Sequence, residues 1–292
     1  MRKTKKNNFI FTALLWTFLA VAVSPVVNVC YGVTEAKADL LVTPVRVAFE
    51  GRERQAVVTL INNSTKTNTY RMEWKTFRMG EDGKYQDIPE DDKSEFAERA
   101  RKMAKMVRFS PRQVTIEPGG RQRVRLSLRR TEDLQDGEYR AHLSFSKLPE
   151  IPEPTETIVK GAQFKLYVNL SFTIPVLYTH GEKNTDVDIS SIVLDPPAEH
   201  NRNKLSLNIT LDRKGANSSY GRLHAFWNPP GGAERKIGTL NNVAVYTERD
   251  QRVMSMPLDV DALNGGQIRV VYAGDGEYKG RIWDEKVFPV AN

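Results

Sequence analysis

The hydrophobic and polar residues of this 292-residue chain alternate most regularly between Phe164 and Tyr178. In its first part every second residue is large and apolar, in the series Phe164, Leu166, Val168, Leu170, Phe172 and Ile174, which we call the apolar ridge. A period of two is the side-chain period of a β-strand, so the segment predicts a strand with one apolar edge. Full burial of the ridge would contribute on the order of 10 kcal/mol. Two interpretations stay open: the ridge packs in the protein's own core, or part of it is available to another chain.

Shorter alternating segments, separated by turn signals, precede the apolar ridge. The segments are Leu40–Phe49, Gln55–Asn62, Tyr70–Phe77, Val107–Ile116, Arg121–Arg129 and Glu138–Phe145. Pro44 lies near the start of the first one, which indicates an edge strand or a strand that changes partners. Residues 79–83 (Met-Gly-Glu-Asp-Gly) predict a hairpin turn. About seven short strands with turns between them favour a β-sandwich of immunoglobulin type.

One stretch of the first half has a different period. Between Asp91 and Val107, apolar residues recur at helical spacing among charged ones, which predicts a helical turn or two on a loop. A charge-rich excursion of this kind is typical of a solvated face, and we assign it no chemistry.

A second series of alternating segments follows Tyr178. It comprises Val187–Leu194, Lys204–Leu211, Arg222–Trp227, Val253–Leu258, Gln267–Ala273 and Lys286–Val290, separated by Pro- and Gly-rich turns. About 110 residues of this kind predict a second, smaller sandwich, with the boundary near Gly181. The expected fold class is therefore all-β, with two tandem immunoglobulin-like β-sandwich domains at residues 39–180 and 181–292.

The first 38 residues read as a secretory signal peptide. Four basic residues precede an apolar run of about 15 residues, and Ala36-Lys37-Ala38 supplies the small residues of a cleavage site. An uncleaved membrane anchor is the alternative, because Phe9–Val29 nearly reaches the ~20 residues that span a bilayer. Pro25 and the later cleavage site argue against it. We expect cleavage after Ala38, with Ala20-Val21-Ala22 as a second possible site, and a periplasmic location.

Removal of the signal peptide changes the charge and the cysteine chemistry. The whole chain has 43 basic and 36 acidic residues, and the signal peptide holds five and one of these, which leaves 38 and 35 and a net charge of +3. Such a small charge gives no reason to expect a nucleic-acid partner. The one cysteine, Cys30, is removed with the signal, so we expect neither a disulfide nor thiol chemistry in the mature protein. About 250 residues can form ordinary hydrophobic cores without disulfides.

No pattern of catalytic residues or metal ligands emerges from the sequence. The four histidines are His142, His180, His200 and His224, and none is spaced as in a zinc site. The sequence contains no nucleophile elbow, phosphate-binding loop or dinucleotide fingerprint. His142 and His224 fall within predicted strands, where a packed or surface histidine is usual. We therefore expect no cofactor, no metal and no enzymatic activity.

Several short motifs, in this order along the chain, resemble the periplasmic chaperones of pilus and fimbria assembly. They are Val45–Gly51, Phe109–Arg112, Pro118–Leu126, Asp136–Arg140 and the apolar ridge, together with Ser218–Gly221 in the second half. The resemblance covers nearly the whole mature chain and is best from Pro44 to Tyr178. It implies two sandwiches around an interdomain cleft, in a divergent branch of the family.

The resemblance also implies a binding mode, in which strand G1 of the chaperone completes a pilin subunit that lacks its last strand. In the family register, Phe164, Leu166, Val168 and Leu170 are the donated side chains, whereas Phe172 and Ile174 pack in the chaperone itself. The loop from Leu148 to Lys160 would then be the flexible entry to G1. The implied partners are pilin-like subunits and an outer-membrane usher, and self-association through the G1 edge is a further possibility.

A carboxylate anchor is implied in the cleft between the domains. The family uses an arginine on its first strand and a lysine on G1 to bind the terminal carboxylate of the subunit. Arg46 matches the arginine, but the place of the lysine falls on Pro175. Arg140, Lys165 or His180 are candidate replacements, and the sequence leaves the choice open. The alternative for Arg46 is an ordinary exposed strand arginine.

The family also has an ion triad between its domains. Arg125 and Glu138 match two of its members, and the third falls on Thr179, so the resemblance predicts an Arg125–Glu138 ion pair. The sequence as a whole favours a non-catalytic chaperone for pilin-like subunits. The alternatives are a structural or adhesive two-sandwich surface protein, whose ridge is fully internal, and a carbohydrate-active enzyme, which would need paired carboxylates about 5–9.5 Å apart.

Overall fold

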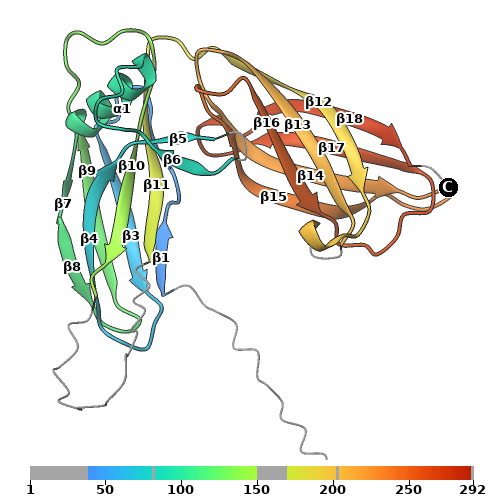
Figure 1. Ribbon diagram of the computed structural model, residues 1–292, viewed down its shortest axis with the longest axis horizontal. Coiled ribbons are helices and arrows are strands. Elements are labelled where there is room, and N and C mark those ends of the chain that lie inside the picture. Colours follow the sequence, from blue (N-terminus) through green and yellow to red (C-terminus); the bar gives the residue numbers. More distant parts are fainter. Residues whose placement is uncertain (1–38, 81–82, 150–169, 202–203, 291–292) are drawn as a thin grey trace, which may run out of the picture. The chain divides into compact units, whose positions relative to one another are not determined.

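The computed structural model describes residues 39–80, 83–149, 170–201 and 204–290. Within these ranges the chain forms eighteen strands, one α-helix and two short 3₁₀ helices. The expected all-β class is confirmed. The strands form two immunoglobulin-like β-sandwiches in sequence, drawn from blue to yellow and from yellow to red in Figure 1.

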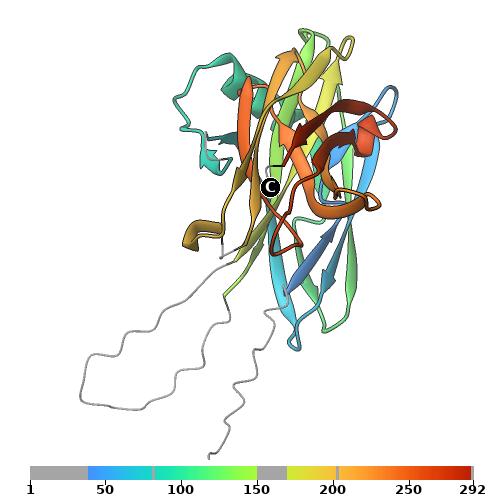
Figure 2. The ribbon, with the colours of Figure 1, turned by 90° about the vertical axis from the view of Figure 1, so that its right-hand side faces the viewer.

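The first sandwich has a four-stranded sheet in the order β1-β3-β9-β7 and a five-stranded sheet in the order β2-β11-β10-β4-β8. A separate hairpin, β5–β6, and helix α1 form an excursion outside these sheets, seen in teal in Figures 1 and 2. The elements are β1 (Leu40–Thr43), β2 (Val47–Phe49), β3 (Gln55–Asn62), β4 (Asn68–Lys75), β5 (Phe77–Met79), β6 (Tyr85–Asp87), α1 (Glu95–Met106), β7 (Val107–Ser110), β8 (Gln113–Ile116), β9 (Arg121–Leu128), β10 (Gly137–Lys147) and β11 (Ser171–His180).

The segment around Pro44 changes partners, which is one of the two alternatives that its sequence indicates. Before it, β1 pairs antiparallel with β3 in the four-stranded sheet. After it, β2 pairs parallel with β11 in the five-stranded sheet. Proline lacks the N–H group that a continuous ladder requires, which makes this position suitable for the change. Arg46 lies directly before β2, in the short connection between the two sheets.

The second sandwich consists of a three-stranded sheet, β12-β13-β16, and a four-stranded sheet, β15-β14-β17-β18. Its strands enclose a hydrophobic core of their own, to which Met79 of β5 is the one contribution among the described residues of the first half. The elements are β12 (Thr185–Asp195), η1 (Glu199–Asn201), β13 (Ser206–Gly215), β14 (Ser219–Asn228), β15 (Arg235–Val245), β16 (Gln251–Pro257), β17 (Gln267–Gly274), η2 (Gly276–Tyr278) and β18 (Ile282–Pro289).

The structure differs from the sequence prediction at helix α1, at strand β15 and in the segment Val107–Ile116, which divides into β7 and β8 in different sheets. Helix α1 has 12 residues rather than a turn or two, and its N-terminus is capped by the Ser94 side chain, which accepts a bond from the backbone N–H of Ala97. Strand β15 was not predicted, because polar residues interrupt its apolar positions and its ladder shifts register twice against β14. None of the described helices is long and apolar enough to cross a membrane.

Candidate functional site

Arg46 is buried and bound to a carboxylate from the second sandwich. Its Nη2 donates to Oε1 of Glu277 at 2.6 Å, and its Nε donates to the same oxygen at 3.0 Å. The two side chains are only 5% and 7% exposed. Glu277 belongs to η2, between β17 and β18. Arg46 is therefore not the exposed strand arginine that was the alternative.

Aromatic rings complete the surroundings of Arg46. Its guanidinium carbon lies 4.5 Å from the centre of the Tyr220 ring and 5.9 Å from that of Tyr246. Burial alone would lower the pKa of Arg46, but the Glu277 carboxylate raises it above the ordinary value for arginine. The Nη1 group is buried without a hydrogen-bond partner. Arg46 thus stays charged and has one donor still unused.

A pocket of about 280 Å³ lies beside this ion pair. Residues from the Pro44–Glu50 segment form one side of it, and residues from the second sandwich form the other. The lining residues are Pro44, Val45, Arg46, Ala48, Glu50, Tyr220, Asp275, Gly276 and Glu277. The guanidinium of Arg46 is thus close to a space that a small part of a ligand can enter.

A second buried arginine repeats this arrangement. Nη2 of Arg140, on β10, donates to Oε1 of Glu248 at 2.5 Å. Its guanidinium carbon lies 3.6 Å from the centre of the Tyr246 ring. Burial opposes its charge and the Glu248 carboxylate favours it, so that its pKa is raised. Nε and Nη1 of Arg140 have no hydrogen-bond partner.

Arg46 and Arg140 both contact Tyr246, because β2, which Arg46 directly precedes, and β10, which carries Arg140, lie in the same sheet. Strand β11 lies between β2 and β10 in the sheet. On β11, Pro175 pairs with His142 of β10 and supplies no cation. Of the replacements left open by the sequence, Arg140 is therefore the one beside Arg46, whereas Lys165 lies outside the described residues.

His180, the third candidate replacement, lies at the end of β11. Its Nε2 is 4.0 Å from a carboxylate oxygen of Asp136, and its Nδ1 is 3.2 Å from the hydroxyl of Tyr178. Its polar contacts are therefore with groups of the first sandwich rather than with Arg46 or Glu277. The structure places it apart from the two-arginine cluster.

His142 is fully buried next to the arginines and is a packed histidine, one of the two states expected. Its ring meets those of Phe77 and Tyr85 edge-on, with centres 5.3 and 4.8 Å away. Both ring nitrogens are buried without a hydrogen-bond partner. Burial and the charges of Arg140 and Arg46 hold its pKa well below the ordinary value. His142 is therefore neutral at physiological pH.

The predicted Arg125–Glu138 ion pair is not formed. Arg125 is exposed on β9 of the four-stranded sheet, and Glu138 is buried on β10 of the other sheet. Glu138 instead accepts two hydrogen bonds from Ser218, one from the backbone N–H at 2.8 Å and one from the hydroxyl. A carboxylate that accepts two such bonds needs no arginine to satisfy it.

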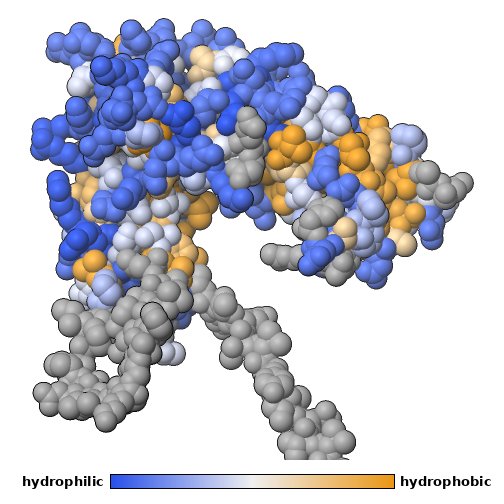
Figure 3. Space-filling model, viewed as in Figure 1, coloured by the Kyte–Doolittle hydropathy of each residue, from blue (hydrophilic) through white to orange (hydrophobic). Residues whose placement is uncertain are grey.

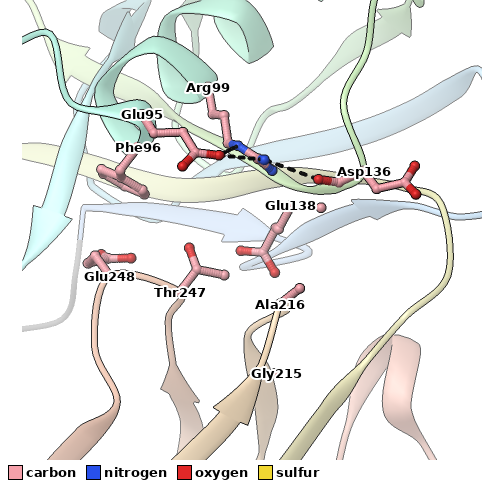
Figure 4. Close-up of a pocket in the computed structure, with 10 residues that line it drawn as sticks. Glu95, Phe96, Arg99, Asp136, Glu138, Gly215, Ala216, Thr247 and Glu248 are labelled. Atoms are coloured by element: carbon pink, nitrogen blue, oxygen red, sulfur yellow. Dashed lines mark hydrogen bonds and ion pairs between the residues drawn. The ribbon is translucent and has the colours of Figure 1, made fainter.

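Figure 4 shows the pocket next to Glu138. It measures about 260 Å³ and is lined by Glu95, Phe96, Arg99, Asp136, Gly137, Glu138, Gly215, Ala216, Thr247 and Glu248. Arg99 bridges the Glu95 side chain and the backbone carbonyl of Asp136 across one wall. The carboxylates that border the pocket are thus largely engaged in internal contacts. Within the described ranges, no three His, Cys, Asp or Glu side chains are grouped so as to hold a metal ion.

The apolar ridge is only partly described. Phe164, Leu166 and Val168 lie outside the described residues, as does most of the Leu148–Lys160 loop. Leu170 directly precedes β11 and is 58% exposed. Ile174 is buried in the core of the first sandwich, and Phe172 packs against that core. The prediction that Phe172 and Ile174 pack in the protein's own core is confirmed.

Several residues of the site escaped the sequence analysis. Glu277, Glu248 and Tyr246 come from connections of the second sandwich, and no local pattern distinguishes them from other loop residues. Ser218 and Tyr220 did carry a signal, since both fall in the Ser218–Gly221 motif. The structure shows what that motif contacts: Ser218 binds Glu138, and Tyr220 covers Arg46.

The sequence matches no protein-family model and no curated protein. Solved structures do match. One is the complex of the chaperone CsuC with the tip adhesion subunit CsuE, from the archaic chaperone-usher Csu pili of Acinetobacter baumannii, at 13% identity and a TM-score of 0.40, covering 87% of this chain and 99% of that one. Another is the chaperone SafB with the pilin SafA of Salmonella enterica, at 11% identity and a TM-score of 0.40, covering 86% and 96%.

A third match is the periplasmic chaperone SfaE, at 12% identity and a TM-score of 0.40, covering 85% of this chain and 98% of that one. The chain resembles pilus assembly chaperones.

Proposed function

We propose that this protein is a non-catalytic periplasmic chaperone that binds pilin-like subunits by lending them a strand and delivers them to an outer-membrane usher. Residues 1–38 would be the export signal, cleaved after Ala38, and residues 39–180 and 181–292 the two domains. Donor-strand exchange needs no ATP, because one donated strand replaces another. The mass of the protein from a periplasmic extract tests the cleavage site.

The proposal rests on the change from buried to exposed side chains along the apolar ridge, between Ile174 and Leu170. Ile174 is buried and Phe172 is half-buried, whereas Leu170, two residues earlier on the same edge of the strand, is exposed. A strand whose apolar face continues beyond the core of its own domain is suited to fill the groove of another sandwich. Leu166, Val168 and Leu170 continue that edge in the sequence, with Phe164 as its far end.

Arg46 supplies the second part of the proposal, a contact with the terminal carboxylate of the client. The pocket beside Arg46 already binds one carboxylate, that of Glu277, through two nitrogens of the guanidinium. A client carboxylate can take that position only if Glu277 leaves it. Arg140 would be the second cation, in place of the lysine that Pro175 replaces.

Co-expression with the pilin-like subunits encoded nearby tests the donated strand. Leu166→Asp, Val168→Asp and Leu170→Asp together should abolish recovery of the subunit in a one-to-one complex. A matched control changes three exposed apolar residues of the second sandwich, Val193, Val253 and Val287, to Asp. Both triple variants add the same charge. Unchanged recovery with the ridge variant would refute the role of the ridge.

The free protein can use the same edge to bind a second copy of itself. We propose self-association through residues 164–170, which size-exclusion chromatography measures in the absence of a client. The ridge variant should then elute as a monomer at concentrations where the parent forms dimers. A parent that stays monomeric at all concentrations would exclude this part of the proposal.

A further inference from the structure

One face of the first sandwich is basic in a way that its fold does not require. On β9, Val124, Leu126 and Leu128 point into the core, so Arg121, Arg123 and Arg125 point outward, and all three are exposed. Alternate residues on a strand are about 6.7 Å apart. Three guanidinium groups thus stand in a row along the outer surface of the four-stranded sheet.

Two more arginines extend this row. Ser127 is the next outward residue of β9, and across the ladder its partner on β7 is the exposed Arg108. Arg129 directly follows β9 and is also exposed. We call Arg108, Arg121, Arg123, Arg125 and Arg129 together the arginine face.

No carboxylate of the structure neutralises this face. The outward positions of β1, β3, β7 and β9 hold no acidic residue: besides arginine they are Leu41, Thr43, Gln55, Val57, Thr59, Ile61, Ser110 and Ser127. Among the described ion pairs none includes an arginine of this face, whereas Arg46, Arg140 and Arg269 are paired. Like charges side by side on a sheet repel one another, so the row does not serve the stability of the sheet.

The neighbouring columns of the same face are apolar or neutral. On β3, Val57 lies opposite Arg125 and is 45% exposed, and Ile61 lies opposite Arg121. On the edge strand β1, Leu41 lies opposite Ile61 and is 52% exposed. The sheet therefore presents arginines on its β9–β7 side and large apolar side chains on its β3–β1 side.

The basic character continues past the β7 edge to the C-terminal end of α1. A hollow of about 550 Å³ there is lined by Arg101, Lys102, Lys105, Arg108, Arg129 and Arg130, with Glu98 as the acidic residue among them. Lysine in the last turn of a helix complements the helix dipole, which accounts for Lys105 but not for the arginines. In Figure 3 the surface around α1 is mainly hydrophilic.

We propose that the arginine face binds the surface of an anionic phospholipid bilayer. Guanidinium groups bind phosphate through two parallel hydrogen bonds. A row of them on a sheet can contact a plane of phosphate headgroups, and this contact requires no pocket of complementary shape. The exposed Leu41 and Val57 can enter the headgroup region next to the bound phosphates. The proposal does not depend on the chaperone function, because Leu170 and Arg46 are not among the residues of this face.

Vesicle flotation tests the proposal with the purified mature protein. The chain should float with vesicles of phosphatidylcholine mixed with phosphatidylglycerol and stay behind with phosphatidylcholine alone. One basic residue at an anionic surface contributes about a fivefold gain in binding. Arg121→Gln, Arg123→Gln and Arg125→Gln together should therefore weaken binding about 100-fold. Added salt should weaken binding of the parent in the same direction.

Two further variants distinguish the arginine face from charge in general. Lys236→Gln, Lys279→Gln and Lys286→Gln remove the same charge from exposed positions of the second sandwich and should leave binding unchanged. Changing the three arginines to lysine keeps the charge and should retain most of the binding. Equal flotation of the parent and the arginine-to-glutamine variant would overturn the proposal. So would a parent that binds neither kind of vesicle, the result expected if the face meets an acidic protein instead.

Discussion

Arg46 and Glu277, 231 positions apart in the sequence, form a buried ion pair with a nitrogen–oxygen distance of 2.6 Å. The pair joins the connection before β2 to the 3₁₀ turn η2 of the second sandwich. Under the proposed function, Glu277 occupies the place of the client's terminal carboxylate. The internal pair would then hold the anchor charged and ready until a client carboxylate displaces it.

Removal of either partner of this pair should destabilise the protein. Glu277→Gln leaves the buried Arg46 charge without its counter-charge, and we expect the free energy of unfolding to fall by about 3–5 kcal/mol. Chemical denaturation followed by tryptophan fluorescence measures the loss. Glu234→Gln, which breaks the more exposed pair with Arg269, is the control and should change stability little. Comparable losses for the two variants would contradict the burial argument.

A double variant separates the charge from the packing. Arg46→Met combined with Glu277→Leu replaces both ions by apolar side chains of similar length, so no buried charge is left unpaired. Its unfolding free energy should be higher than that of either single variant. A thermodynamic cycle of the four proteins gives the coupling energy. A double variant whose loss equals the sum of the two single losses would show that the two residues act independently.

Glu277→Gln should have the opposite effect on client binding. Loss of the competing carboxylate leaves the Arg46 guanidinium free for the client, and one charge-assisted hydrogen bond contributes about 1.5–3 kcal/mol. The Kd for a pilin-like subunit should therefore fall about 10- to 150-fold. Arg46→Ala should raise that Kd. Titration of each purified variant with a peptide from the subunit's C-terminus, as free acid and as amide, measures both effects. An equal preference for acid and amide would remove Arg46 from the anchor.

Ser218 rather than Arg125 should determine the stability contributed by Glu138. Ser218→Ala removes the hydroxyl donor from a buried carboxylate, and we expect a loss of about 1–3 kcal/mol in the free energy of unfolding. Arg125→Gln changes an exposed side chain that forms no ion pair with Glu138, so its unfolding curve should coincide with that of the parent. The reverse order of effects would restore the pairing predicted from the sequence.

His142 should make the protein less stable below about pH 6.5. Its pKa in the folded state lies well below the ordinary value of 6.5, so the unfolded chain takes up a proton that the folded chain does not. Stability contributed by this group is present above pH 6.5 and is lost as the pH falls toward the folded-state pKa, by up to about 1.4 kcal/mol per pH unit. Denaturation curves of the parent and of His142→Leu between pH 7.5 and 5 measure this slope. Parallel curves would show that His142 is not the titrating group.

Local patterns predicted most of the strands of both sandwiches. Strand β9 is the clearest case, because each inward apolar residue alternates with a polar one and Pro118-Gly119-Gly120 precedes it. Strand β15 escaped prediction because its polar residues and its register shifts obscure the alternation. Met79 shows a second limit: the sequence assigns it to a hairpin turn of the first half, yet it packs in the core of the second sandwich.

The sequence by itself determined the all-β class, because that class depends on a backbone period of two. It limited the Pro44 segment to an edge strand or a change of partners, because proline lacks a backbone N–H. The division of the ridge between Leu170 and Phe172 came from the family resemblance. Only the tertiary structure decided which charges meet. Arg46 pairs with Glu277, Arg140 pairs with Glu248, and Glu138 accepts hydrogen bonds from Ser218. In each case the partners are more than 75 positions apart in the sequence. The residues around a loop carboxylate in the sequence do not identify the arginine that it will neutralise. The pairing becomes necessary only because folding buries both groups in one place.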